Sequence, residues 1–173
     1  MKLNKKGMQC LRLLHILSMS IWFGAVVSIG VLAYICFFAL SEADFLTIAP
    51  LVPELYRKVV MPAAIFTIVQ GITYGLFTNW GFFKYKWVLF KWILALLVTL
   101  CTGLGGIGNM FSALDKVKNS GFTGGLADGG FVLLFIALQI LFMIIMIILS
   151  VFQPKNRKRV QEFSYSGSIS TMN

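Results

Sequence analysis

The sequence predicts an all-α protein of the polytopic membrane class, built as a bundle of four transmembrane helices. Of its 173 residues, 58% are hydrophobic and 12% are charged. The charged share is about half of what soluble domains carry, and the mean hydropathy is +0.86. The apolar residues also fall into four blocks, each long enough for the roughly 20 residues that a membrane crossing needs. We therefore expect one transmembrane domain over residues 1–153 and no soluble domain.

The four expected spans cover about residues 8–40, 58–78, 86–108 and 130–152. The first connection, from Ser41 to Tyr56, alternates apolar and acidic residues and contains two prolines, which favours a short helix lying on the outer surface. The third connection, from Asn109 to Gly130, is rich in glycine, and we expect a mobile loop. Residues 154–173 are basic and then serine-rich, which is typical of a disordered cytoplasmic tail.

The distribution of basic residues predicts the orientation in the membrane. Lysines and arginines gather before the first span, between the second and third spans, and after the fourth span, whereas the first connection is acidic. Cytoplasmic loops carry the excess of basic residues, so we expect both termini in the cytoplasm (N-in/C-in). Arg57 and Lys58 are the exceptions. The net charge of +9 then reflects contact with anionic lipids at the cytoplasmic face, and nucleic-acid binding is not expected.

Two ionisable residues lie inside apolar runs and point to a functional site. His15, the only histidine, lies within the first span, and Lys91 lies within the third. An ionisable side chain in hydrocarbon is costly unless it faces the protein interior, water or a partner. At 1.5 Å per residue, both lie about 10 Å from the cytoplasmic side. We therefore predict a buried His–Lys site in the cytoplasmic half of the bundle.

Other polar or soft side chains fall in the same layer. Three of them share a helical face with His15 in the first span, because they recur at intervals of three or four residues. The candidate cofactor-binding residues are His15, Lys91, Arg12, Met19, Trp22, Gln70, Tyr74, Trp87, Met143 and Met146, with His15 as the metal ligand; no catalytic residue is assigned.

Each candidate has an alternative structural role. Arg12 and Lys91 could extend to lipid phosphates, the two methionines could pack in the core, and Gln70 could form an interhelical hydrogen bond. Small residues repeat every fourth position in two spans and predict close helix–helix seams. These seams comprise Ala63, Thr67, Gly71 and Gly75 in the second span, and Ser20, Gly24 and Ser28 in the first.

Three motifs suggest a family. They are His15 followed by Trp22-Phe23-Gly24, the run Val60-Met61-Pro62-Ala63-Ala64-Ile65, and Trp87-Val88-Leu89-Phe90-Lys91. With these motifs the chain resembles a family of bacterial predicted integral membrane proteins of unknown function, which implies that its location is a bacterial plasma membrane. It is distantly similar to HemJ-type protoporphyrinogen oxidases and to CopD-type copper-resistance proteins. The resemblance to the HemJ type implies that His15 is a haem ligand and that Lys91 is an essential partner.

These observations leave three hypotheses open. In the first, His15 ligates a b-type haem, with the sixth position open or filled by Met143 or Met146, while Lys91 and Arg12 pair with the propionates. In the second, the soft ligands His15 and Met19 handle copper. In the third, the protein is a non-catalytic membrane interaction or scaffold protein. The sequence does not decide whether the chain is an enzyme. The expected partners are the lipid bilayer, a second copy of the chain or a membrane redox partner.

Overall fold

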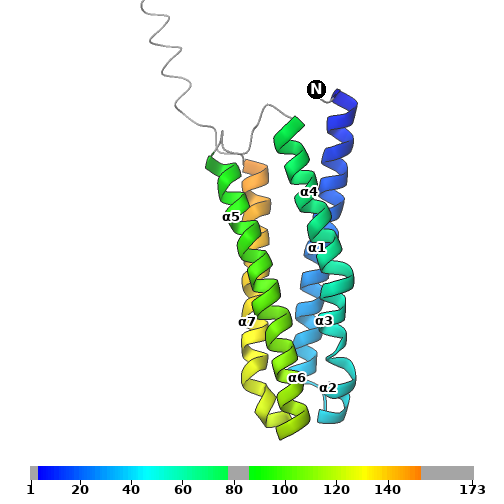
Figure 1. Cartoon of the computed structure of the whole chain (residues 1–173), viewed down its shortest axis with the longest axis vertical. Helices are drawn as coiled ribbons and strands as arrows, with labels where there is room; N and C mark the ends of the chain where they lie inside the picture. Colours follow the sequence, from blue (N-terminus) through cyan, green and yellow to red (C-terminus); the bar gives the residue numbers. More distant parts are fainter. Residues whose placement is uncertain (1–3, 78–85, 153–173) are drawn as a thin grey trace, which may run out of the picture.

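A computed structural model describes residues 4–77 and 86–152, and every element in this part of the chain is a helix. Four helical stretches are long and apolar enough to cross a membrane: Lys6–Phe38, Glu42–Thr73, Trp87–Ser120 and Asp128–Phe152. They pack side by side into one elongated bundle (Figure 1). The predicted four-helix transmembrane bundle is therefore confirmed, and the chain is a multi-pass membrane protein.

The bundle has two distinct ends. Helix α1 (Lys5–Phe38) begins at the same end at which α7 (Phe122–Phe152) finishes, and we call this the terminal end (Figure 1). The opposite end, which we call the loop end, carries the short helix α2 (Glu42–Ile48) and helix α6 (Asn109–Ser120). Helices α1 and α7 run antiparallel and pack against each other.

The second span is assembled from four consecutive pieces. These are α2, α3 (Leu51–Leu55), the π-helix η1 (Tyr56–Val60) and α4 (Met61–Phe77). The hydroxyl of Ser41 caps α2 by accepting a hydrogen bond from the Asp44 backbone N–H at 3.3 Å. Instead of one helix on the outer surface, there are two short helices with buried apolar faces. Phe45 of α2, for example, is fully buried and packs against Phe37 with ring centroids 5.2 Å apart.

The third span is longer than predicted, and the expected mobile loop between Asn109 and Gly130 is wrong. Helix α5 (Lys86–Leu100) continues through the π-helix η2 (Cys101–Gly108) directly into α6. Only Gly121 separates α6 from α7, and its φ of 79° is the left-handed conformation that glycine adopts readily. Helix α6 forms because its buried residues recur at helical spacing: Met110, Ala113 and Val117. The apolar stripe of α6 packs within the bundle, and the glycines that follow Gly121 lie in the first turns of α7, where Gly129 packs against Phe37.

The two predicted seams differ in outcome. In α4, Thr67 hydrogen-bonds to Ser18 of α1, and a β-carbon on Gly71 would lie 3.9 Å from the Trp92 ring of α5, so this stripe does face other helices. In α1, by contrast, Ser20, Gly24 and Ser28 are exposed on the outside of the bundle. The two serine hydroxyls donate to backbone oxygens of their own helix. The prediction of a seam at Ser20, Gly24 and Ser28 within this bundle is therefore wrong.

Candidate functional site

A hydrogen-bonded cluster joins α1 and α4 around His15. The hydroxyl of Ser18 donates to Oε1 of Gln70 at 2.9 Å and also lies 3.1 Å from the backbone oxygen of His15. The hydroxyl of Thr67 lies 3.0 Å from the Ser18 hydroxyl and 2.7 Å from the backbone oxygen of Ala63, its own-helix acceptor. The His15 imidazole is itself hydrogen-bonded to the Gln70 side chain and lies within electrostatic range of Lys91. His15 is therefore tied to the second span by side-chain hydrogen bonds rather than pointing freely into lipid.

Lys91 joins α5 to α7 in the same part of the bundle. Its ammonium donates to the hydroxyl of Ser150 at 2.6 Å and lies 4.9 Å from the centre of the Trp87 ring. The Ser150 hydroxyl in turn lies 2.8 Å from the backbone oxygen of Met146. Lys91 therefore links α5 to α7, and its ammonium lies between the Trp87 indole ring and the Ser150 hydroxyl.

The helix register shows that His15 and Lys91 lie at matching heights. Gly30 of α1 packs against Ile136 and Ile140 of α7, and Gly129 of α7 packs against Phe37. Extending this antiparallel register at 1.5 Å per residue places Ser150 at the height of Ser18, to within about one helical turn. Because Lys91 binds Ser150 and Ser18 lies one turn from His15, all four spans contribute to one layer. We call it the His15–Lys91 layer: His15, Ser18, Thr67, Gln70, Lys91 and Ser150.

The inner side of this layer is rich in hydrogen-bond donors. Nε2 of Gln70 is buried in this layer, and Nε1 of Trp22 is buried two helical turns from His15; neither has a hydrogen-bond partner among the described residues. All carboxylates in the described ranges lie near the loop end, on α2, α3, α6 and the first part of α7: Glu42, Asp44, Glu54, Asp115 and Asp128. Within the described ranges, the His15–Lys91 layer therefore combines an ammonium and unpaired N–H donors with no nearby acid, which favours a ligand that supplies oxygen acceptors and negative charge.

The two methionines do not belong to this layer, although both are buried on α7. The same register puts Met146 about 10 Å and Met143 about 15 Å further from the terminal end than His15. Helical side chains also tilt toward the N-terminus of their own helix. His15 therefore leans toward the terminal end, while both methionines on the antiparallel α7 lean the opposite way. The expectation that Met143 or Met146 could be a sixth ligand opposite His15 is not supported by this geometry.

The remaining candidates have varied positions. Arg12 is exposed on α1, where its guanidinium can reach the lipid headgroups, rather than facing the cluster. Met19 is half-buried and packs against the core, and Trp22 is almost fully buried. Trp87 lies beneath the Lys91 ammonium. The side chain of Tyr74 and the predicted tail at 154–173 lie outside the described residues.

Sequence reasoning missed the residues that connect the layer. Ser18 and Thr67 lie at the contact between the first and second spans. The Ser150 hydroxyl accepts a hydrogen bond from Lys91, and the Trp92 ring lies beside Gly71. Serine and threonine are common in membrane helices, where they usually bond to their own backbone, as Ser20 does here. Helical spacing could have identified Ser18, because it lies one turn from both His15 and Trp22 and therefore shares their helix face.

No group of three or more His, Cys, Asp or Glu side chains is arranged to hold a metal ion in residues 4–77 and 86–152. A metal bound at His15 would therefore need a cofactor such as haem to supply most of its ligands. Comparisons with protein-family models, curated proteins and solved structures find no match to this chain. Any functional assignment depends on the site itself.

Proposed function

We propose that the chain binds an anionic tetrapyrrole, haem b, within the membrane, with His15 as the protein ligand to the iron. The observation that carries the proposal is the His15–Lys91 layer, in which one imidazole and one ammonium lie at the same height and interact electrostatically, with no carboxylate beside them among the described residues. Haem b carries two propionates, and ion pairing with Lys91 would offset the cost of burying both charges. Bound haem would supply one-electron redox chemistry.

The surrounding residues support this donor set. Gln70 holds the imidazole by a hydrogen bond, which fixes its orientation. Lys91 uses one of its three N–H donors on Ser150 and keeps two for a carboxylate. The unpartnered N–H groups of Gln70 and Trp22 add neutral donors from α4 and α1. Arg12 is left as a contact to lipid phosphate, because its side chain is exposed.

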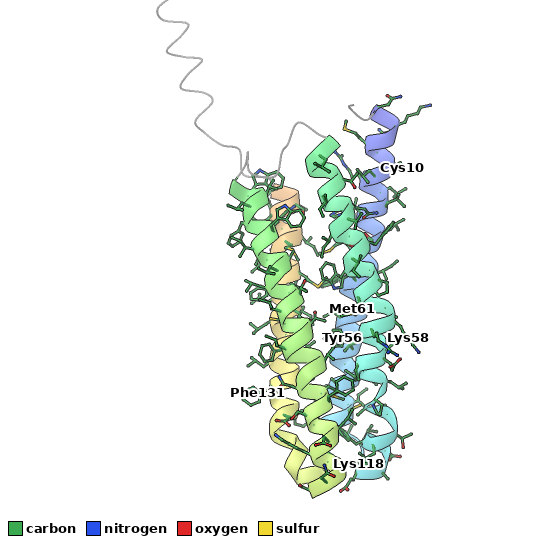
Figure 2. The ribbon with its side chains drawn as sticks, in the orientation of Figure 1. Cys10, Tyr56, Lys58, Met61, Lys118 and Phe131 are labelled. Carbon is green, nitrogen blue, oxygen red and sulfur yellow. The ribbon has the colours of Figure 1, made fainter. Side chains whose placement is uncertain are left out.

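We further propose that both termini face the cytoplasm, with anionic lipids at that face. Arg57 and Lys58, the two bases on the wrong side for this orientation, both pair with Glu54, at 2.8 and 3.1 Å. Figure 2 shows Lys58 on the outer side of the bundle. Because one carboxylate partly neutralises the two bases, they oppose the positive-inside distribution less than their number suggests.

The test is an absorption spectrum of the full chain, purified in detergent from haem-replete cells and after addition of haemin. The proposal predicts a Soret band that is lost in His15→Ala and retained in Ser20→Ala, a matched α1 control whose hydroxyl bonds only to its own helix. Lys91→Met should weaken haemin binding about tenfold or more, as expected for loss of a charged hydrogen bond. A wild-type protein that stays colourless and does not retain haemin would refute the proposal.

The same preparation distinguishes the other hypotheses. Copper handling predicts that Cu(I) quenches Trp22 fluorescence in a way that depends on Met19, which lies one turn from His15 on α1. A non-catalytic membrane interaction protein predicts neither a Soret band nor copper-dependent quenching, together with a folded chain after joint replacement of His15 and Lys91. A homodimer or a redox partner would instead be detected as a change in the size of the purified complex.

A further inference from the structure

A second polar layer lies deeper in the bundle and is not used by the proposed haem site. Tyr56 of η1 and Gln139 of α7 are both fully buried. The thiol of Cys101, from η2, lies within electrostatic range of the Tyr56 phenol. The three residues come from the second, third and fourth spans.

Apolar side chains separate this layer from His15. In the register of α7 with α1 and with α5, Val26, Val98 and Met143 fall between the two polar layers, and all three are fully buried. The centre of the second layer lies about 15–20 Å closer to the loop end than His15. The two layers are therefore separate sites, and evidence for or against haem at His15 does not bear on the deeper one.

One polar group in the deeper layer has no partner in the described protein. The Tyr56 hydroxyl donates to Oε1 of Gln139 at 3.3 Å, so the oxygen of this amide has a hydrogen-bond partner. Nε2 of Gln139 has no hydrogen-bond partner in residues 4–77 and 86–152. Buried amide groups nearly always have a partner, either protein or ordered water. The free end of Gln139 therefore points to a bound molecule.

The packing around Tyr56 limits the size of that molecule. A β-carbon on Gly106 of η2 would lie 2.9 Å from the Tyr56 hydroxyl oxygen, and one on Gly105 would overlap the Phe135 ring. Glycine at these two positions allows the η2 backbone to approach both neighbouring spans closely. The π-helical form of η1 and η2 fits this location, because π-helical turns are frequent at functional sites. Such close packing favours a ligand of the smallest size.

We propose that Tyr56 and Gln139 bind a single buried water molecule within the membrane, at the point where η2 approaches Tyr56. Water both donates and accepts hydrogen bonds, so it satisfies the free end of the Gln139 amide whichever way that amide is turned. Buried waters of this kind typically make about three hydrogen bonds to otherwise unsatisfied groups. The water joins the second and fourth spans within the buried core.

The test is hydroxyl-radical labelling of the detergent-purified full chain, in which X-ray radiolysis of bound water modifies the side chain beside it. Tyr56 is expected to be labelled even though it is fully buried. Phe45, equally buried in an apolar contact with Phe37, is the matched control and is expected to stay unlabelled. Gln139→Met, which retains the volume of the side chain and removes the amide, should abolish labelling of Tyr56.

Two results would overturn the proposal. Tyr56 that is labelled no faster than Phe45 has no water beside it. Labelling of Tyr56 that persists unchanged in Gln139→Met comes from transient opening of the bundle. If Gln139→Met does not fold, Tyr56→Phe serves as the second variant, because it removes only the hydroxyl oxygen. Labelling at position 56 should then be lost, and unchanged labelling in that variant would again contradict a bound water.

Discussion

Lys91 and Ser150 are joined by a 2.6 Å hydrogen bond that connects α5 to α7 within the His15–Lys91 layer. Ser150→Ala should lower the free energy of unfolding in detergent by about 0.5–2 kcal/mol, the range for interhelical hydrogen bonds in membrane proteins. Ser28→Ala is the control, because the Ser28 hydroxyl donates only to its own helix. Equal effects of the two substitutions, measured by thermal unfolding, would show that the bond to Lys91 does not stabilise the bundle.

Ser18 is expected to be the most sensitive serine in α1. Its hydroxyl donates to Gln70 and lies 3.0 Å from the Thr67 hydroxyl within the buried interface. Ser18→Ala removes the donor to Gln70, while Thr67 keeps its 2.7 Å hydrogen bond to the Ala63 backbone oxygen, so we expect a loss of about 1 kcal/mol in unfolding free energy. Ser20→Ala, two residues away and exposed, should change it by no more than about 0.5 kcal/mol. If the two variants unfolded at the same temperature, the interhelical cluster would not be formed.

Side chains added to η2 should have effects that depend strongly on position. Gly106→Ala would place a methyl group against the Tyr56 ring, and Gly105→Ala would place one inside contact distance of Phe135. Overpacking of this kind typically costs about 1–3 kcal/mol or more. Gly103→Ala meets nothing within 4 Å and should be neutral or slightly stabilising, because alanine favours helix over glycine. Similar unfolding temperatures for the three variants would contradict the packing described for η2.

Asp128 ties α6 to α7 near the loop end. Its carboxylate lies 2.8 Å from the Lys116 ammonium and accepts a hydrogen bond from Ser112 at 2.9 Å. Asp128→Asn should lower the unfolding free energy by about 1 kcal/mol at low salt, and by less at high salt, because the Lys116 side chain is half exposed. Asp115→Asn, on the exposed face of α6, is the control. A loss that did not change with salt would indicate that the ion pair is not responsible.

The four spans and the height of the polar layer were predictable from the sequence, because hydropathy and a rise of 1.5 Å per residue depend only on position along the chain. The contribution of His15, Gln70 and Lys91 to one layer follows from that count. The side chains that link the helices were not predictable. Whether Ser18 or Ser20 faces inward depends on the rotation of α1 about its axis, which small residues do not fix.

The third connection shows a second limit. The glycines near the loop end suggested a flexible connection, yet apart from Gly121 they lie in the first turns of helix α7, where Gly129 packs against Phe37. Tertiary packing overrides the weak intrinsic helix propensity of glycine. The methionines illustrate the same point for the site. Met143 and Met146 carry the thioether sulfur that can ligate haem iron, but the antiparallel register of α1 and α7 directs them away from His15. Residue spacing within one helix does not determine the register between two helices.

The central claim is that His15 and Lys91 meet inside the bundle rather than facing lipid. It is tested most directly by replacing both with cysteine in a chain whose native cysteines are alanine, and treating it with a short bifunctional thiol reagent. The account predicts efficient cross-linking of the His15→Cys/Lys91→Cys pair, detected by mass spectrometry. It predicts little cross-linking for Ile16→Cys/Lys91→Cys, because Ile16 is 55% exposed on the outer face of α1. Equal yields for the two pairs, or no product for the first, would contradict the claim.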